Sequence, residues 1–428
     1  MTQQVIVIGA GIGGLAAALA LARQGVRVRV IERASEIREV GAGIQTGPNA
    51  FRAFARLGVG DQMEAIGFRP GAIRLLDSMT DQELSCQTLG QAFEARFEYP
   101  YRVAFRADVQ RVLLQAALAL PDLIEITLGD GFTSFEQDPV GVAVLLDSGA
   151  TVQGTALIGA DGIHSRVRGQ VLSEAPPLAS GYIAYRAVLP VAEIPEHLLT
   201  DDVQVWVGPY HHLVCYKLRC GQLFNLVAIF RSARTGTGWD ATGSQSELMA
   251  EFAGVSAKVS ELLMQIRDWK VWVLYDRDPE PGWSEGRATL LGDAAHPMLP
   301  YLAQGACMAI EDAVVLGDQF SQAPTIPEAF AAYERLRYPR TSAVQLAARR
   351  AGVINHVAGA ERDARNEALA RQKSDDYEAV AWLFEGADSP AGQPEGGYGV
   401  FSTIPGADTG SASRFSTPRA SSNISWPG

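Results

Sequence analysis

The sequence predicts an α/β fold in which an antiparallel sheet is inserted into a parallel sheet. A strand, a glycine-rich turn, a helix and a second strand open the chain at Val5, and aromatic-rich strand patterns dominate 181–272. A short buried strand pattern returns at 288–291. Because so short a strand cannot form a domain alone, we expect it to rejoin the N-terminal parallel sheet, which makes the first domain discontinuous.

The first element is the uncharged stretch 5–22, which is long enough to suggest a membrane span. The preceding MTQQ lacks the positive charge of a signal peptide, and four glycines would destabilise a spanning helix. We therefore expect no membrane association. Residues 5–8 are expected to form a buried strand, 15–24 a helix and 26–31 a second strand.

The turn between the first strand and the helix fits the pattern G-x-G-x-x-G. Gly9 permits a tight turn, Gly11 lets a pyrophosphate approach the backbone, and Gly14 lets the helix pack closely on the strand. The helix amino end presents N–H groups and a positive dipole end to phosphates. Glu32 ends the second strand, where a carboxylate accepts ribose hydroxyls. The alternative is a βαβ unit without a ligand. The predicted cofactor-binding residues of this unit are Gly9, Gly11, Ile12, Gly13, Gly14, Glu32 and Arg33.

The composition is that of a globular chain with room for two domains: 428 residues, 47% apolar and 20% charged. The net charge of −12 and the lack of a basic patch disfavour a nucleic-acid partner. Only four cysteines in so long a chain indicate a reducing, cytoplasmic compartment. No metal site is expected.

Cys215 and Cys220 have the C-x4-C spacing of the redox pair in disulfide-reducing flavoenzymes. Here the pair lies in CYKLRCGQ, which reads as a strand that enters a turn. A separation of five also places the two thiols on opposite faces of a straight strand. We therefore expect two unpaired structural cysteines.

The remaining elements follow from hydrophobic periodicity and turn residues. Strands are expected at 73–77, 124–128, 142–147, 156–158, 181–190, 201–208, 211–218 and 223–232. The last four are consecutive and have hairpin-like spacing, which favours an antiparallel sheet. Helices are expected from about 48, and at 106–120, 245–253, 257–267, 305–320 and 326–351. Residues 387–428 are rich in Gly, Ser, Pro and Ala and are expected to be a disordered tail.

Three motifs now occur in order: GAGIGG with Glu32, GADG at 159–162, and LLGDAAHP at 290–297. From about Val5 to Ala351 the chain resembles the single-component FAD-dependent aromatic hydroxylases, monooxygenases of the p-hydroxybenzoate hydroxylase type. The resemblance implies a Rossmann-like FAD-binding domain, an inserted antiparallel-sheet substrate domain and C-terminal helices. The implied boundaries are 1–72, 98–180 and 284–322 for the FAD-binding domain, 73–97 and 181–283 for the substrate-binding domain, 323–386 for the helical segment and 387–428 for the tail.

The resemblance also assigns cofactor contacts outside the first motif. Gly292 and Asp293 match the pair that binds the ribityl hydroxyls of FAD, with an N-cap aspartate as the alternative. The helix that begins with Gly305 and Ala306 points its amides at the flavin N1/O2 edge, where its dipole stabilises the anionic reduced flavin.

Three side chains complete the implied FAD site. Arg106 matches an arginine that contacts FAD, with a surface helix cation as the alternative. Asp161 matches the second fingerprint near the pyrophosphate and the nicotinamide path. Gln45 matches the flavin-facing segment, with an ordinary loop amide as the alternative. FAD is expected to bind tightly but not covalently.

No second strand-embedded G-x-G-x-x-G is present in the sequence. This fits a family whose nicotinamide cofactor binds transiently without a Rossmann domain of its own, and it argues against reductases with two nucleotide domains. The habit of the family implies NADH, with NADPH as the alternative, and a homodimer.

The substrate side is expected on the strand pattern GPYHHLVCYKL, where His212 and Tyr216 share one face. Electrophilic attack is easier on a phenolate, and because a phenol has a pKa of about 10, a histidine base assists its deprotonation. Tyr216 is expected to hold the phenol or carboxylate. A polar strand face is the alternative. The further predicted substrate contacts are His211, Pro300, Tyr301 and Gln304.

Within the family the chain is most similar to the 3-hydroxybenzoate 6-hydroxylase branch, whose substrate-contacting His and Tyr match His212 and Tyr216. The stretches EVGAGIQTGPNA, HLVCYKL and NLVAIFRS support this similarity. Pro300 departs from it, since some members of the branch carry Gln there. Proline at this position is typical of p-hydroxybenzoate, salicylate and hydroxynicotinate hydroxylases.

The resemblance implies hydroxylation of a phenolic aromatic acid with NADH and O2 through a flavin C4a-hydroperoxide, with 3-hydroxybenzoate as substrate and gentisate as product. One alternative is decarboxylative hydroxylation, as in salicylate 1-monooxygenase or 6-hydroxynicotinate 3-monooxygenase. Other classes are a flavin-dependent reductase that inserts no oxygen and a silent flavin-binding interaction protein, for which the tail from Ala387 is the sequence hint.

Overall fold

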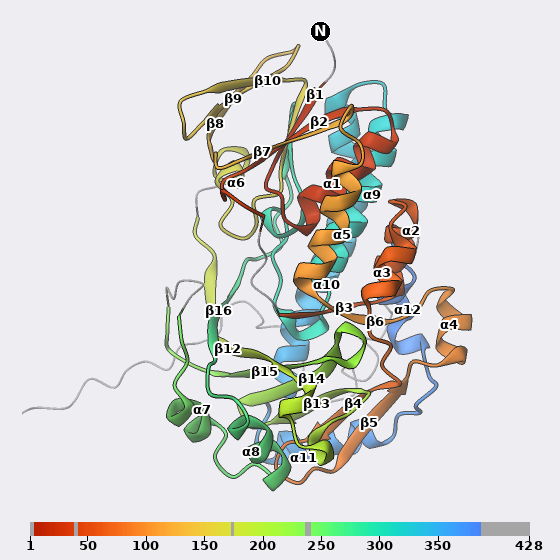
Figure 1. The fold of residues 1–428 in the computed structure, drawn as a ribbon, viewed down its shortest axis with the longest axis vertical. Helices are drawn as coiled ribbons and strands as arrows, with labels where there is room; N and C mark the ends of the chain where they lie inside the picture. Colours follow the sequence, from red (N-terminus) through yellow and green to blue (C-terminus); the bar gives the residue numbers. More distant parts are fainter. Residues whose placement is uncertain (1–3, 38–41, 173–174, 236–240, 387–428) are drawn as a thin grey trace, which may run out of the picture.

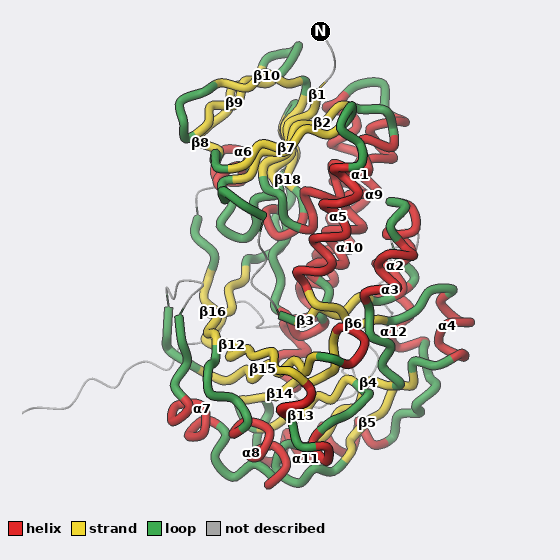
Figure 2. The backbone as a smooth tube through the Cα atoms, viewed as in Figure 1, coloured by secondary structure: helices red, strands yellow, loops and turns green. Residues whose placement is uncertain are grey.

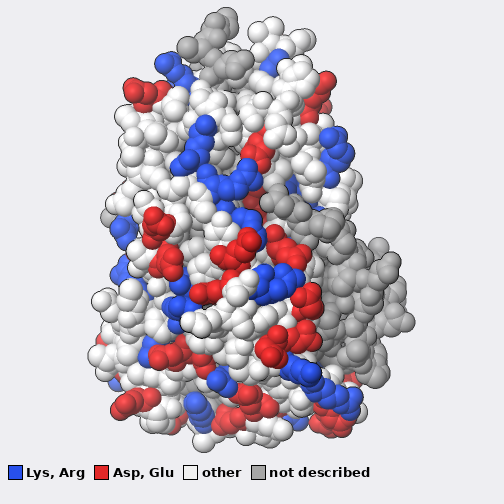
Figure 3. All heavy atoms as spheres, turned by 90° about the vertical axis from the view of Figure 1, so that its right-hand side faces the viewer, with Lys and Arg blue, Asp and Glu red and all other residues white. Residues whose placement is uncertain are grey.

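The computed structural model describes residues 4–37, 42–172, 175–235 and 241–386, so the predicted tail at 387–428 lies outside the described residues. Figure 1 shows an elongated molecule with a parallel sheet at one end and a larger sheet at the other. On the face drawn in Figure 3, acidic and basic side chains are interspersed.

The sheet at the first end has six strands in the order β17-β18-β11-β1-β2-β7. β18 pairs in parallel with β11, which confirms that the strand after the insertion rejoins the N-terminal sheet. β17 pairs with β18 in antiparallel register. The strands are β1 (Gln4–Ile8), β2 (Arg27–Glu32), β7 (Ile124–Leu128), β11 (Ala156–Gly159), β17 (Ser284–Glu285) and β18 (Ala288–Leu290).

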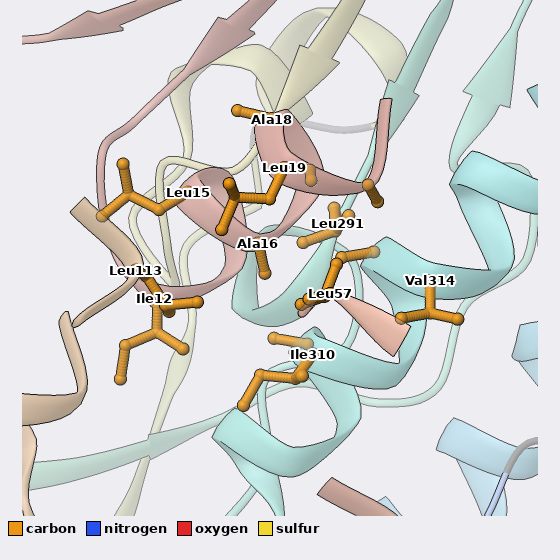
Figure 4. Packing of buried hydrophobic residues seen from close by; sticks show 14 of the residues in the cluster. Ile12, Leu15, Ala16, Ala18, Leu19, Leu57, Leu113, Leu291, Ile310 and Val314 are labelled. Carbon is orange, nitrogen blue, oxygen red and sulfur yellow. The ribbon is translucent and has the colours of Figure 1, made fainter. Parts of the chain in front are cut away.

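Apolar helices cover one face of this sheet (Figure 2). The helix α1 begins at Ile12, three residues earlier than predicted, because the third and fourth glycines of the turn already lie inside it. Its apolar residues pack against Leu113, Leu291 and Ile310 (Figure 4). The uncharged stretch is therefore a strand and a core helix, and no described helix is long and apolar enough to cross a membrane. The covering helices are α1 (Ile12–Arg23), α5 (Arg106–Leu118) and α9 (Gly305–Gln322).

A small antiparallel sheet and a short helix pack beside the other face. The sequence predicted its middle strand and missed the two outer ones, whose half-exposed residues show weak alternation. These elements are β8 (Phe132–Gln137), β9 (Val142–Leu146), β10 (Thr151–Gly154) and α6 (Arg166–Val171).

The larger sheet has seven strands in the order β16-β12-β15-β14-β13-β4-β5. Hairpin spacing correctly predicts the neighbours β13, β14 and β15, but β12 pairs with β15 and β16 instead of β13. β13 also pairs in parallel with β4, so the sheet is mixed and not purely antiparallel. The strands are β4 (Ala72–Asp77), β5 (Glu83–Thr88), β12 (Leu178–Pro190), β13 (Val203–Gly208), β14 (His211–Leu218), β15 (Leu223–Arg231) and β16 (Lys270–Asp276).

Two short helices, α7 (Gln245–Glu251) and α8 (Ala257–Met264), cover the outer face of this sheet. The inner face turns toward the two-stranded antiparallel sheet of β3 (Gly43–Thr46) and β6 (Arg102–Phe105) and toward the long helix α10 (Ile326–Asn355). α10 runs four residues beyond its predicted end, and this extension reaches the sheet. The remaining helices are α2 (Pro48–Arg56), α3 (Gly60–Ile66), α4 (Gln91–Phe97), α11 (Gly359–Ala370) and α12 (Glu378–Phe384).

Candidate active site

The glycine turn after β1 has the geometry that its pattern predicts. Gly9 has φ of +102°, and a Cβ there would lie 2.5 Å from the carbonyl oxygen of Ala160. A Cβ on Gly14 would collide with the carbonyl oxygen of Gly9, whereas one on Gly11 would meet open space. Packing therefore requires the first and last glycines, and the backbone at Gly11 is open to a ligand.

Glu32 is held directly beside this turn. Its Oε2 accepts a hydrogen bond from the Ala10 amide at 2.8 Å, and its Oε1 accepts one from the Ala34 amide at 2.9 Å. A carboxylate has about four acceptor sites, so ribose hydroxyls can bind as well. Arg33 is exposed next to it.

The GADG loop follows β11 and packs against the glycine turn. Asp161 Oδ2 accepts hydrogen bonds from the amides of Arg166 at 2.8 Å and Val167 at 3.3 Å. The side chain therefore caps the start of α6, and burial raises the pKa of its carboxyl. The loop lies where the sequence placed it, but its aspartate is engaged by the protein.

Asp293 lies after β18, in a short 3-10 helix of residues Gly292–Ala294. Its side chain is exposed, yet burial raises the pKa of its carboxyl, although the charges of Arg106 and His296 oppose this shift. The Asp293 carboxylate is therefore accessible to a ligand at the carboxyl end of β18. Leu291 is the N-cap of that 3-10 helix, so the alternative of an N-cap aspartate is wrong.

The amino end of α9 lies beside this carboxylate. A Cβ added to Gly305 would lie 3.7 Å from Asp293 Oδ1, and Gly305 and Ala306 are only half-buried. Arg106, the first residue of α5, is half-buried and its charge acts on Asp293. The structure thus brings Arg106, Asp293 and the amino end of α9 close together, and the contact of Arg106 with FAD stays a prediction.

Gln45 connects this site to the larger sheet. Its side chain accepts a hydrogen bond from the Tyr101 hydroxyl and also bonds to Tyr216. The neighbouring Gly43 amide donates to Asn225 Oδ1 at 2.9 Å, which ties β3 to β15. Burial raises the pKa of Tyr216, which is 3% exposed and stays a neutral phenol.

His212 lies on the same inner face of β14 and is 3% exposed. Its Nδ1 lies 2.7 Å from Nε2 of His356, and its ring centroid lies 5.5 Å from that of Tyr301. Burial lowers the pKa of His212 to about 3, so the imidazole is neutral near pH 7. In the tautomer in which Nδ1 donates to His356, the Nε2 of His212 is an acceptor for a phenol.

His211 lies on the opposite face of the sheet. Its Nε2 is 2.9 Å from Ser78 Oγ, and its ring stacks on Phe252 at a centroid distance of 4.3 Å. Neighbouring residues on a strand point to opposite faces, so His211 cannot share the face of His212. We therefore do not retain it as a substrate contact.

The loop between β18 and α9 contains the other predicted contacts. Pro300 begins a 3-10 helix, Pro300–Leu302, and Ala303 has a left-handed φ of 54°. Tyr301 points to the two histidines, whereas the Gln304 amide oxygen accepts a hydrogen bond from Asn49 Nδ2 at 2.9 Å. Tyr301 thus stays in the proposed substrate site, and Gln304 is engaged in holding α9 on α2.

The sequence analysis missed a buried charge network, defined by His296, Glu311, Asp312, Arg337 and Arg340. Asp312 accepts from His296 Nε2 and Arg337 Nε, both at 2.6 Å, and from the Gly292 amide at 3.1 Å. Glu311 accepts from Arg337 at 2.7 Å and from Arg340 at 2.8 Å. Burial alone would raise both carboxyl pKa values, but the adjacent cations lower each to about 2.

The charge network locks the Gly292–Asp293 turn onto α9 and α10. Its signal is visible as charges inside apolar helix patterns, IEDA and RYPR.

His356 and Tyr182 were also missed, and the two rings stack at 4.5 Å. The histidine follows the predicted end of α10 and shows no motif. The two cysteines of the C-x4-C spacing are both free, which confirms their unpaired state, but Cys220 lies in a turn and not on the strand.

Three features indicate a class of protein: an open backbone at a glycine turn, an accessible carboxylate beside a helix amino end, and a sheet face with a neutral imidazole. It is an enzyme that holds a dinucleotide between a parallel sheet and a separate substrate surface. A sequence model of the FAD binding domain matches residues 2–347. The chain belongs to this family, and within it to the FAD-dependent aromatic hydroxylases, with FAD as its cofactor.

Curated relatives agree with this assignment. The chain is 42% identical to 3-hydroxybenzoate 6-hydroxylase of Polaromonas naphthalenivorans (strain CJ2), over 89% of this chain and 95% of the relative. It is 39% identical to 3-hydroxybenzoate 6-hydroxylase of Klebsiella oxytoca, over 89% and 96%. Among solved structures, HpxO of Klebsiella pneumoniae, complexed with FAD and uric acid, has a TM-score of 0.80 at 29% identity, covering 90% of this chain and 96% of that one.

Proposed function

We propose that this monooxygenase hydroxylates a phenolic aromatic acid and that its substrate is 3-hydroxybenzoate, converted to gentisate with NADH and O2. The observation that carries the proposal is the neutral, buried His212 on the inner face of β14, with Tyr216 on the same face and Tyr301 across from it. The names of the two curated relatives support this substrate.

The cofactor site proposed here comprises the glycine turn, Glu32, Arg106, Asp293 and the amino end of α9. Bound FAD supplies the hydride acceptor for NADH and the activation of O2. Overall, one oxygen atom enters the ring, the other leaves as water, and NADH is oxidised to NAD⁺. The accessible carboxylate of Asp293, at the carboxyl end of β18 and beside α9, supports a contact to the polyol hydroxyls of the flavin.

The residues of the inner sheet face prepare the substrate. His212 accepts the phenol proton or its hydrogen bond, which raises the electron density of the ring at the para carbon, C6 of 3-hydroxybenzoate. Tyr216 and Tyr301 orient the ring. Around them lie Ala184, Ile229 and Leu299, which are at most 3% exposed, and such apolar surroundings exclude water.

The test is NADH oxidation by the FAD-loaded enzyme with 3-hydroxybenzoate, salicylate, 4-hydroxybenzoate and 6-hydroxynicotinate, with each product identified by mass spectrometry. We expect gentisate from 3-hydroxybenzoate and a loss of hydroxylation in His212→Ala with FAD still bound. General bases typically contribute about 10²–10⁴-fold. Intact coupled turnover in His212→Ala would contradict the role of this histidine.

Pro300 favours a second candidate, decarboxylative hydroxylation of the salicylate or hydroxynicotinate type. In that reaction the ring carbon that carries the carboxylate is attacked and CO2 leaves. Release of CO2 with salicylate or 6-hydroxynicotinate, and no gentisate, would favour it over the first candidate.

Three finer points belong to the same proposal. NADH is the proposed hydride donor, and a comparison of its kcat/KM with that of NADPH tests the choice. A homodimer is proposed and is tested by the mass of the FAD-loaded enzyme in solution. A cytoplasmic location is proposed from the cysteine content.

A further inference from the structure

The inner face of the sheet contains a second histidine. His356 is the C-cap of α10 and is 4% exposed. Its Nε2 lies 2.7 Å from Nδ1 of His212, and its ring stacks on Tyr182 with an interplanar angle of 18°. Tyr301 lies 5.5 Å from it, the same centroid distance as to His212. The two imidazoles therefore form one hydrogen-bonded pair beside the proposed phenol site.

The backbone around His356 is anchored from three sides. The His356 carbonyl accepts from the Tyr210 amide at 3.0 Å, which attaches the end of α10 to the β13–β14 turn. The His356 amide donates to the Val353 carbonyl at 3.1 Å. Arg365 of α11 donates to the Asn355 carbonyl at 3.0 Å. The ring position is thus set by the helix, the sheet and α11 together.

The pair is neutral in the resting protein. Burial lowers the pKa of His212 to about 3 and that of His356 well below its usual value, and the nearby cations lower the latter further. Two neutral imidazoles share one proton in their hydrogen bond, so one ring donates and the other accepts. The titratable or charged groups that act on the pair are Tyr182, Tyr301, Arg231 and Arg365, together with His211 from the opposite face of the sheet.

We propose that His356 is the second member of a two-histidine proton relay, in which its Nε2 accepts the proton on His212 Nδ1 and thereby keeps His212 Nε2 unprotonated toward the substrate phenol. This inference rests on the proposed hydroxylation of a phenol. When the phenol O–H bond breaks, an N–H bond forms at His212 Nε2. The proton on His212 Nδ1 moves to His356 Nε2, so His212 stays neutral, His356 becomes an imidazolium, and its positive charge balances the phenolate. His356 is a positioning residue, because it acts on the substrate through His212.

Two variants separate orientation from proton transfer. His356→Gln can accept a hydrogen bond from His212 Nδ1 and preserve its tautomer, but an amide cannot take up the proton. His356→Leu removes both functions. His197→Leu is the matched control, because His197 is exposed and pairs with Glu261 far from the sheet face.

The first readout is independent of turnover: ultraviolet difference spectra of 3-hydroxybenzoate bound to the FAD-loaded enzyme, titrated with pH. The wild type should bind the phenol with a lowered pKa. His356→Leu should raise the bound phenol pKa by at least one unit and lower kcat at pH 7 by about 10-fold or more. His356→Gln should give values between those of the wild type and His356→Leu, and the control His197→Leu should match the wild type.

The outcomes distinguish this inference from the proposed function. A wild type that hydroxylates a phenolic acid, with a bound phenol pKa and a pH–rate profile that His356→Leu leaves unchanged, overturns the relay. A wild type that hydroxylates no phenolic acid overturns the proposed function. A lowered phenol pKa that depends on His356 would still support the relay in that case.

Discussion

The charge network and the two-histidine pair are both buried polar clusters, and they differ in how charge is compensated. In the charge network, Glu311 and Asp312 are ionised, and each accepts from arginine side chains at 2.6–2.8 Å. In the pair of His212 and His356, both rings are neutral and are joined by one hydrogen bond. A buried cluster whose charges are compensated fixes the structure. In a neutral hydrogen-bonded pair, by contrast, the shared proton can move when a ligand binds.

Arg337→Met should have the largest effect on this contrast. The substitution leaves two buried carboxylates with reduced compensation, and breaking a buried ion pair in this way costs about 3–5 kcal/mol. Urea unfolding with saturating FAD measures the loss. Arg335→Met on the same helix is the matched control, since Arg335 is exposed, and it should stay within about 0.5 kcal/mol. Equal effects of the two substitutions would mean that the network contributes nothing.

The two clusters should lose stability in different pH windows. A histidine with a lowered pKa stays neutral in the folded protein, so stability decreases as pH falls below its unfolded pKa of about 6.5. Each buried histidine contributes a slope of about 1.4 kcal/mol per pH unit. His356→Leu should therefore flatten the stability curve between about pH 6 and 5. The same slope in wild type and variant would contradict a neutral His356.

The carboxylates titrate lower. Their folded pKa values of about 2 are depressed, so their contribution is present above the unfolded pKa of about 4 and is lost as pH falls through 2. In Arg337→Met this acid-dependent loss should shrink, while the slope near pH 6 stays as in the wild type. Unfolding free energies measured from pH 7 to 2 test both windows in one series.

Asp293→Asn should weaken FAD binding by about 10-fold, because a charged acceptor of hydroxyl groups becomes a neutral one. The fold should not be weakened, since the pKa of this carboxyl is already raised by burial. Quenching of flavin fluorescence on binding to the apoprotein gives the Kd. An unchanged Kd would remove Asp293 from the proposed cofactor site.

Cys220→Ser should have the smallest effect, within about 0.5 kcal/mol, because the thiol is exposed in a turn. Turnover should also be unchanged. A loss of NADH oxidation in this variant would revive the redox pair that the free cysteines argue against.

Residues 5–32 show how far local pattern determines structure. The strand, the turn and the helix follow from consecutive β-branched, glycine and alanine residues, since each turn conformation depends on a few neighbouring φ angles. The fit of Gly14 against the Gly9 carbonyl was predictable from spacing alone. Placing His212 and Tyr216 on one face likewise needed only the period of a strand.

The position of β12 shows that local sequence patterns do not determine the order of strands in a sheet. Hairpin spacing favoured β13 as its neighbour, but β12 pairs with β15 and β16, because a long connection allows a non-sequential order. Gln304 was predicted to contact the substrate, but it faces Asn49 of α2 instead. Which neighbour a side chain meets depends on how distant elements pack.

The sequence by itself determined the nucleotide turn, the parallel strand that returns at 288, the family and the face of β14 that carries the imidazole. Only the tertiary structure decided that His212 meets His356, 144 residues away, and that Asp312 joins the Gly292 turn to Arg337. The physical reason is the distance along the chain over which each interaction acts. Backbone conformation responds to adjacent residues, whereas hydrogen bonds between buried side chains depend on the length of α10 and on the packing of helices against both sheets.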